Sequence, residues 1–485
     1  MNRGLKGGLL RPFSKKQIND IHLATIEILE NIGIEVHSAR IMEVFQRGGA
    51  EVDYKKRKVW IPEHLVKEAL NNAPSKVILC GRNPKYDIVL EDSRVYYGMG
   101  GTPTPFIRDI ETGHFRRPTK KDMADATRLG DALEHYSFIM AIAGAFDVPY
   151  EVEYEHEWEA LFNNTEKPIV YSAPGVISTK RVLEMASAIV GGQEELRRRP
   201  ILSLYSETVS PLAMFEPNET MIECATAGIP VTLSPGPVVG ASGPGTVAGS
   251  SVVLNAENLA AITLMQLVKK NSPVIYAHSV TIMDPRTGRV CYGAPELALA
   301  SSVLNAQLAE FYRLPTFGFS GGSDSKLPDA QAGCETMMLA LMNALAGINL
   351  MHDCGYLAGG SVGSMEMAVI CNEILGDVSR IIRGIDINDE TLAVDIIRAV
   401  GPGGHFFSQK HTLDFIGREI HMPKLFDRNA PETWLKEGGK DIAAKAKEQV
   451  KRILREHYAQ PLPAEIRKKI AEIVKEEERE LVKQV

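Results

Sequence analysis

Eight short apolar segments between residues 95 and 351 constrain the fold of this chain more than any other feature. Each is rich in β-branched residues and precedes a stretch with helical periodicity, and five begin directly after a proline, which suits a chain entering a strand. They begin at Val95, Phe138, Ile169, Ile201, Val231, Val274, Thr316 and Ile348. Unbroken alternation of strands and helices indicates a parallel sheet, and eight strands are the number that closes a barrel. A doubly wound open sheet is the alternative, although it usually contains fewer strands.

The repeating part of the chain predicts an α/β fold with a (β/α)8 TIM barrel over residues 94–400. Residues 1–93 contain three helical patterns and three short strands, which suit a small N-terminal α/β cap region. Residues 401–485 are expected to form a C-terminal helical extension. Its last helix, from Ala464, is highly charged and is expected to present a solvated face or a subunit contact.

Composition excludes several classes of protein. The 485 residues carry a net charge of −7, so nucleic acid is not an expected partner. The six cysteines form no C-x2-C pair, which argues against a structural zinc module and suggests reduced thiols. The N-terminus lacks the apolar segment of a signal peptide, and no run approaches the ~20 apolar residues of a membrane span. We expect a cytoplasmic protein and, because barrels with long terminal helices commonly associate, a homo-oligomer.

The chemistry of a barrel of this kind belongs at the C-terminal ends of the strands. Aromatic and acidic residues occur together at these predicted ends. Tyr97, Phe146, Tyr205 and Tyr356, with Glu207 or Asp324, are suited to surround a quaternary ammonium group through cation–π and ionic contacts. Simple packing at the rim of the barrel is the alternative interpretation of each ring.

The pair His352-Asp353 is the strongest candidate for polar site residues, because it stands at the end of the eighth predicted strand. A histidine beside an acid suits a base, an orienting residue or a metal ligand. Adjacent residues of a strand point to opposite faces, so both face the barrel axis only if the strand has already ended. His278 and His405 are weaker candidates.

Two glycine-rich segments give weaker signals. The loop 240–246 has neither of the common nucleotide-binding patterns. Residues 359–363 precede a predicted helix, whose N-terminus favours an anion such as a substrate carboxylate. Ordinary capping of this helix by Ser361 or Ser364 is the alternative.

Several short segments together resemble the trimethylamine methyltransferase superfamily, and specifically its members without pyrrolysine. These segments are residues 97–103, 255–257, 284–288, 323–333, 345–349, 352–357, 401–405 and 411–412. The resemblance runs from the N-terminal helix to about Trp434, and it is specific when the segments are taken together.

The resemblance implies a barrel enzyme that passes a methyl group to the Co(I) corrinoid (cobalamin) of a separate corrinoid protein, with no cofactor held tightly by this chain. Relatives that act on trimethylamine carry pyrrolysine near the end of strand seven, where this chain has ordinary residues, 323–334. Relatives without pyrrolysine are similar to demethylases of quaternary amines such as glycine betaine, proline betaine, carnitine or γ-butyrobetaine. We therefore expect a small methylated amine or betaine as substrate.

Strand-end position and this resemblance together assign expected roles. A quaternary ammonium leaves as a neutral tertiary amine, so no general acid is needed, and no metal ligand is expected. The site must hold the cation, anchor a carboxylate and exclude water. We expect Tyr97, Tyr205 and Tyr356 near the ammonium, Gly100, Gly101 and Ser323 in the substrate pocket, His352 near the carboxylate or lining the pocket, and Glu207 and Asp324 as supporting charges.

Two alternatives stay open at this point. A zinc-dependent methyltransferase needs at least three converging ligands, for which His352, Cys354 and His278 are the candidates. A non-catalytic scaffold that binds betaine or delivers corrinoid is the other, because fold alone does not prove activity.

Overall fold

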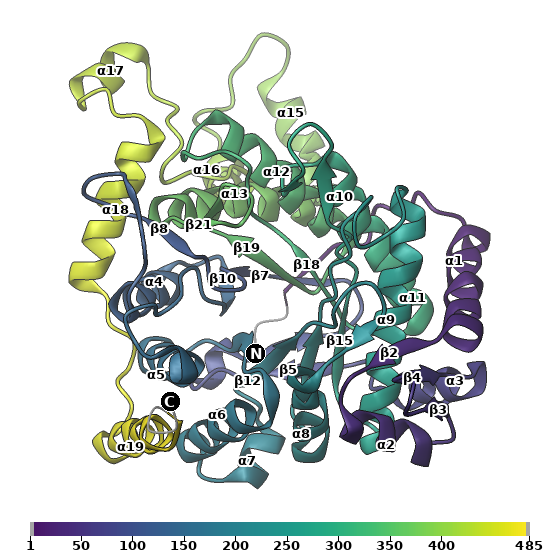
Figure 1. The fold of residues 1–485 in the computed structure, drawn as a ribbon. Helices are drawn as coiled ribbons and strands as arrows, with labels where there is room; N and C mark the ends of the chain where they lie inside the picture. The colour runs from purple at the N-terminus through teal and green to yellow at the C-terminus, as the bar shows by residue number, and fades with distance from the viewer. Residues whose placement is uncertain (1–3, 482–485) are drawn as a thin grey trace.

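The eight predicted strands close into one parallel barrel in the computed structural model, which describes residues 4–481 (Figure 1). Neighbouring strands follow chain order, and the last pairs with the first through Leu350 and Tyr96. The strands are β7 (Arg94–Met99), β10 (Tyr136–Ile139), β11 (Ile169–Ser172), β12 (Leu202–Ser206), β14 (Val231–Leu233), β15 (Val274–Ala277), β18 (Thr316–Phe319) and β19 (Leu350–Cys354). The predicted fold class is confirmed, and the open sheet is excluded because β19 closes on β7.

Helices lie between successive strands and form the outer layer. They are α4 (Lys120–Ala132), α5 (Glu153–Asn164), α6 (Gly175–Val190) with α7 (Gln193–Arg198), α8 (Thr220–Ala227), α9 (Val247–Val268), α10 (Pro295–Leu299) continuing through the π-helical turn η5 (Ala300–Leu304) into α11 (Asn305–Tyr312), α12 (Ala330–Ala346) and α13 (Met365–Arg383). Side-chain caps fix several starts, because Thr119, Thr246, Asp329 and Ser364 each accept a backbone N–H of the first turn.

The N-terminal end of the barrel is closed by a hairpin of β5 (Val77–Leu79) and β6 (Ile88–Leu90). Its apolar side chains share one buried cluster with inward-facing residues of the barrel such as Tyr96 and Phe138. The amide of Val89 donates to the hydroxyl of Tyr96, which ties the hairpin to β7. The barrel is therefore plugged at one end, and ligand access belongs to the other.

The remaining N-terminal elements cover α9. The helices α1 (Lys15–Glu27), α2 (Ala39–Arg47) and α3 (Glu63–Asn72) pack against it. The strands β2 (Ile34–Val36), β3 (Glu51–Asp53) and β4 (Lys58–Trp60) form a sheet with β13 (Ala213–Met214) from the loop after β12. Among the described residues α9 alone has the length and composition of a membrane-crossing helix, and 83% of its most apolar window is buried, as in a core helix.

The last two helices of the C-terminal extension pack on the helices of the barrel. The helices α14 (Asp389–Leu392), α15 (Val394–Val400), α16 (Lys410–Glu419) and α17 (Pro431–Lys436) precede α18 (Ile442–Glu456), which packs on α13 and α4. The last helix, α19 (Ala464–Leu481), packs on α5 and α6 and buries Ile470, Ile473 and Val474. One face of this charged helix is thus covered by its own barrel.

Candidate active site

A continuous row of five aromatic rings crosses the C-terminal ends of β12, β18 and β19. Tyr205 lies 5.9 Å from Phe317, whose ring stacks on His352 at 4.0 Å between centroids. His352 also contacts Phe319 at 4.8 Å, and Phe319 meets the edge of Tyr292 at 5.6 Å. Stacked and edge-to-face rings at these distances hold one another in place. The row gives this end of the barrel an aromatic wall.

His352 and Asp353 both join this cluster, although they are adjacent in a strand. The pairing of β19 with β7 shifts register between Met351 and Cys354, and Asp353 has a φ of 70°. This irregularity turns the acid back toward the histidine, so that Nδ1 of His352 lies 2.7 Å from Oδ1 of Asp353. Nε2 of His352 is buried and has no hydrogen-bond partner among residues 4–481. A buried, unsatisfied imidazole nitrogen costs free energy, so this atom calls for a partner such as a water molecule or a ligand.

Glu207 follows β12 directly and faces the same cluster. One of its carboxylate oxygens accepts a short hydrogen bond from the hydroxyl of Tyr205. Protein surrounds Glu207 on most sides, yet its side chain is exposed to water. Desolvation by the surrounding protein raises the pKa of Glu207; the Tyr205 hydroxyl and His352 lower it, and the charge of Asp353 raises it.

Asp353 is the second acid of the cluster and is fully enclosed. Burial raises its pKa, and the adjacent His352 opposes that shift. Its amide donates to the carbonyl of Gly100 at 2.6 Å. A Cβ atom on Gly101 would lie 2.2 Å from Oδ1 of Asp353, so only glycine fits opposite this carboxyl group.

Tyr292 is a site residue that the sequence did not indicate. It follows the hairpin of β16 (Ile282–Asp284) and β17 (Arg289–Cys291), which is inserted after β15. The carboxylate of Asp324 accepts the amides of Tyr292 at 2.8 Å and Gly293 at 3.0 Å. Glu335 in turn accepts the hydroxyl of Ser323 at 2.5 Å and the amide of Asp324 at 2.9 Å. Ser323 and Asp324 therefore hold the loop that carries Tyr292.

Comparison with known proteins decides the family. A family model described as "Trimethylamine methyltransferase (MTTB)" matches residues 5–482. The chain belongs to this family. It is 38% identical to trimethylamine methyltransferase MttB of Desulfitobacterium hafniense strain DCB-2, over 98% of this chain and 96% of that protein. It is 35% identical to trimethylamine methyltransferase MttB of Methanosarcina thermophila, over 96% and 97% of the two chains. It is also 34% identical to the glycine betaine methyltransferase of D. hafniense strain Y51, over 87% and 88%.

Not every residue expected in the site of this trimethylamine methyltransferase family member reaches the cluster. Tyr205, Glu207, His352 and Gly101 do. Tyr97 does not, because its neighbour Tyr96 takes the inward position and Tyr97 faces outward beside Ser379 of α13.

Two other expected residues support the site from its edge, whereas Phe146 does not contact the aromatic row. The hydroxyl of Tyr356 donates to the carbonyl oxygens of Thr102 and Ala141, which fixes the segment after β7. A Cβ atom on Gly100 would lie 2.3 Å from the Ala141 carbonyl oxygen, so this glycine permits close packing of the same segment. Phe146 is exposed, with the guanidinium of Arg117 4.8 Å from its ring centre.

The three candidate zinc ligands do not converge in this family member. His278 hydrogen-bonds Tyr276 at 3.2 Å, outside the barrel, and burial lowers its pKa to about 3. Sγ of Cys354 lies 3.2 Å from the hydroxyl of Ser320, away from Nε2 of His352. Among residues 4–481, no group of three or more His, Cys, Asp or Glu side chains is placed to hold a metal ion. The donor set that a zinc-dependent mechanism requires is not assembled.

The anion site suggested by residues 359–363 has an ordinary explanation. The hydroxyl of Ser364 accepts the amide of Met367 at 3.1 Å and caps α13. Gly359 and Gly360 instead lie against the ring of Tyr292, where a Cβ atom on Gly360 would come within 3.1 Å of that ring.

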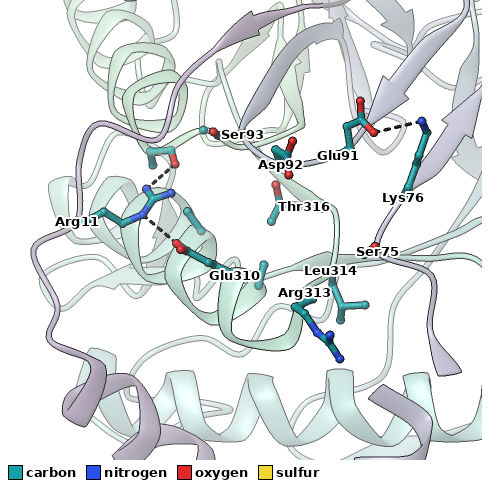
Figure 2. Close-up of a pocket in the computed structure, with 14 residues that line it drawn as sticks. Arg11, Ser75, Lys76, Glu91, Asp92, Ser93, Glu310, Arg313, Leu314 and Thr316 are labelled. Carbon is teal, nitrogen blue, oxygen red and sulfur yellow. Dashed lines mark hydrogen bonds and ion pairs between the residues drawn. The ribbon is translucent and has the colours of Figure 1, made fainter. Parts of the chain in front are cut away.

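A separate polar pocket of about 540 Å³ opens at the opposite end of the barrel (Figure 2). It lies beside Ser93 and Thr316, near the N-terminal ends of β7 and β18. Its charges are largely paired, with Arg11 on Glu310 and Lys76 on Glu91. This pocket contains none of the aromatic row.

Proposed function

We propose that this chain transfers a methyl group from a quaternary amine of the betaine type to the Co(I) corrinoid of a separate carrier protein in the cytoplasm. The observation that most supports this proposal is the aromatic row with Glu207 and Asp353 beside it, at the end of the barrel where barrel enzymes bind substrate. The names of the relatives, trimethylamine and glycine betaine methyltransferases, support a methylated amine as donor.

The arrangement suits recognition of a cation that carries methyl groups. A quaternary ammonium has no N–H to donate, so it is recognised by aromatic faces and by negative charge. Tyr205 and Tyr292 supply rings near the two ends of the row, and Glu207 supplies a carboxylate open to water. Nε2 of His352, which lacks a partner among the described residues, is available for the carboxylate of a betaine.

The acceptor is a substrate of the reaction and not a group that this chain holds. Its Co(I) centre supplies the electron pair of the new bond to the methyl carbon, and the electrons of the C–N bond return to nitrogen. The amine then leaves neutral, without protonation. The task of this chain is to hold the ammonium in one orientation and to keep water from the reacting carbon.

Residues 323–334 support a quaternary amine over trimethylamine. The family resemblance places pyrrolysine of the trimethylamine enzymes in this region, where this chain has ordinary residues. Here Ser323 and Asp324 make hydrogen bonds that fix the neighbouring loop.

Calorimetric titration tests recognition of the cation directly. Glycine betaine, proline betaine, carnitine and γ-butyrobetaine are compared with analogues in which an uncharged carbon replaces the positively charged nitrogen, such as 3,3-dimethylbutanoate for glycine betaine. We expect one betaine to bind at least ~10-fold more tightly than its carbon analogue, which corresponds to about 1.4 kcal/mol. Equal affinity for both would show that shape alone is recognised and would contradict the proposal.

A further inference from the structure

The aromatic row runs outward from the interior of the barrel and ends on Tyr292. Phe317 is fully buried and shares one apolar cluster with Tyr96 and Phe138, which fill the interior of the barrel. Phe319 is the last residue of β18, and Tyr292 lies beyond it and is only partly buried. The row is therefore closed at its inner end by packed side chains, and Tyr292 is its outermost ring.

Backbone without side chains borders the ring of Tyr292 at two edges. A Cβ atom on Gly322, in the loop after β18, would lie 3.1 Å from the ring, and a Cβ atom on Gly360, in the segment after β19, would also lie 3.1 Å from it. Both glycines have a positive φ, 87° and 77°, which other residues seldom adopt. Neither position has a side chain that could move into the volume of the ring, so removal of the ring opens that volume to a ligand.

The backbone of Tyr292 is fixed, and its hydroxyl lies near the acids of the site. The two carboxylate oxygens of Asp324 accept the amides of Tyr292 and Gly293 at 2.8 and 3.0 Å. Burial raises the pKa of Tyr292, and so do the charges of Asp353, Glu207 and Asp324. The ring therefore has one position, at the mouth of the barrel and close to both acids of the aromatic row.

We propose that Tyr292 determines how long a methyl donor the site accepts. The inference rests on the proposed function, since it concerns the quaternary amine bound there. An ammonium group held between Glu207 and the aromatic row leaves the rest of the donor to extend toward the mouth, because packed side chains fill the inner end. Tyr292 stands on that path, so its ring limits the length of the chain that joins the ammonium to the carboxylate.

Calorimetry on Tyr292→Ala tests this inference. Glycine betaine and γ-butyrobetaine carry the same trimethylammonium group, and γ-butyrobetaine has two more CH2 groups before its carboxylate. We expect the affinity for γ-butyrobetaine relative to glycine betaine to rise at least ~10-fold in Tyr292→Ala, because each CH2 that moves from water into the opened space favours binding about fourfold. Tyr292→Phe is the matched control, because it keeps the ring, and its ratio of affinities should equal that of the wild type.

The outcomes separate this inference from the proposed function. An unchanged ratio in Tyr292→Ala would overturn the inference alone. An equal rise in Tyr292→Phe would also overturn it, because the hydroxyl and not the size of the ring would then set the preference. A wild type that binds none of the betaines would overturn the proposed function and the inference with it.

A series of alkyltrimethylammonium ions provides a test on the wild type that needs no variant. From tetramethylammonium to hexyltrimethylammonium, the affinity of the wild type should rise while the alkyl chain is short and fall once the chain reaches the ring of Tyr292. In Tyr292→Ala the fall should come at a longer chain. An affinity of the wild type that rises through the whole series would show that no side chain limits the length of the donor, and would overturn the inference.

Discussion

At the scale of single residues, the site depends on one irregularity at the end of β19. Alternation along a regular strand would send His352 and Asp353 to opposite faces. The register shift and the positive φ of Asp353 bring both into contact at 2.7 Å. The sequence predicted that this pair stands at the end of the eighth strand, and the structure places it there, but the turn that unites the two side chains depends on close packing against Gly100 and Gly101.

The charge of Glu207 should contribute to cation binding. Glu207→Gln keeps the size of the side chain and removes its charge, so we expect the affinity for the best betaine to fall about tenfold, or ~1.4 kcal/mol. Tyr97→Phe is the control, because Tyr97 faces outward, and its affinity should match the wild type. Both affinities are measured by calorimetry. Full affinity in Glu207→Gln together with a loss of affinity in Tyr97→Phe would show that Tyr97, and not Glu207, contacts the ligand.

Binding should also depend on pH. Desolvation raises the pKa of Glu207 and Asp353 above their ordinary values of 4.5 and 3.8. A bound cation favours the ionised carboxylates, so affinity is highest above both pKa values and falls as the pH falls through them. The decline should begin above pH 4.5, approach tenfold per pH unit for each group protonated, and be shallower in Glu207→Gln. Affinity that is constant or rises on acidification would show that neither acid faces the ligand.

At the scale of elements, most of the barrel was predictable because each strand is a short apolar run between a turn and a helix. β19 begins at Leu350 and not at Ile348, since the side chain of Asn349 is used to bridge Thr316 and Arg94. Tyr292 was missed because it reaches the site from an inserted hairpin, whereas the prediction considered strand ends.

The loop from Glu207 to Met214 is held by one buried carboxylate on α9. Glu257 accepts the amide of Leu212 at 2.7 Å and the hydroxyls of Ser210 and Thr208 at 2.8 and 3.2 Å. Loss of these acceptors leaves buried donors unsatisfied, which costs about 1–3 kcal/mol.

Glu257→Ala should therefore lower the free energy of unfolding by about 2 kcal/mol and weaken betaine binding, because the loop carrying Glu207 is released. Glu257→Gln, which keeps an acceptor oxygen, should restore most of both properties. Urea denaturation and calorimetry on the two variants provide the comparison. Unchanged stability and affinity in the alanine variant would show that Glu257 does not hold the loop that carries Glu207.

At the scale of the whole molecule, the two ends of the barrel are lined by different side chains. The β5–β6 hairpin fills one end with apolar side chains, and the aromatic row and both acids lie at the other. The polar pocket beside the hairpin is therefore not expected to take part in methyl transfer (Figure 2).

A substitution in that pocket tests whether it takes part in substrate binding or methyl transfer. Lys76→Ala removes the exposed ion pair with Glu91, which contributes between 0 and about 1 kcal/mol to stability. We expect betaine affinity and the rate of methyl transfer to stay within about twofold of the wild type. A loss of more than tenfold in either quantity would indicate that the active site lies in this pocket and not at the aromatic row.

The most direct test of the central claim is a methyl-transfer assay. The protein is mixed with a corrinoid carrier in the Co(I) state and with each of the four betaines or trimethylamine, and the change in corrinoid absorbance from Co(I) to methyl-Co(III) is followed. We expect conversion with one betaine, none with trimethylamine, and slower conversion in Glu207→Gln. Conversion with trimethylamine alone would contradict the proposed substrate, and tight binding of a betaine without conversion would instead identify a non-catalytic scaffold.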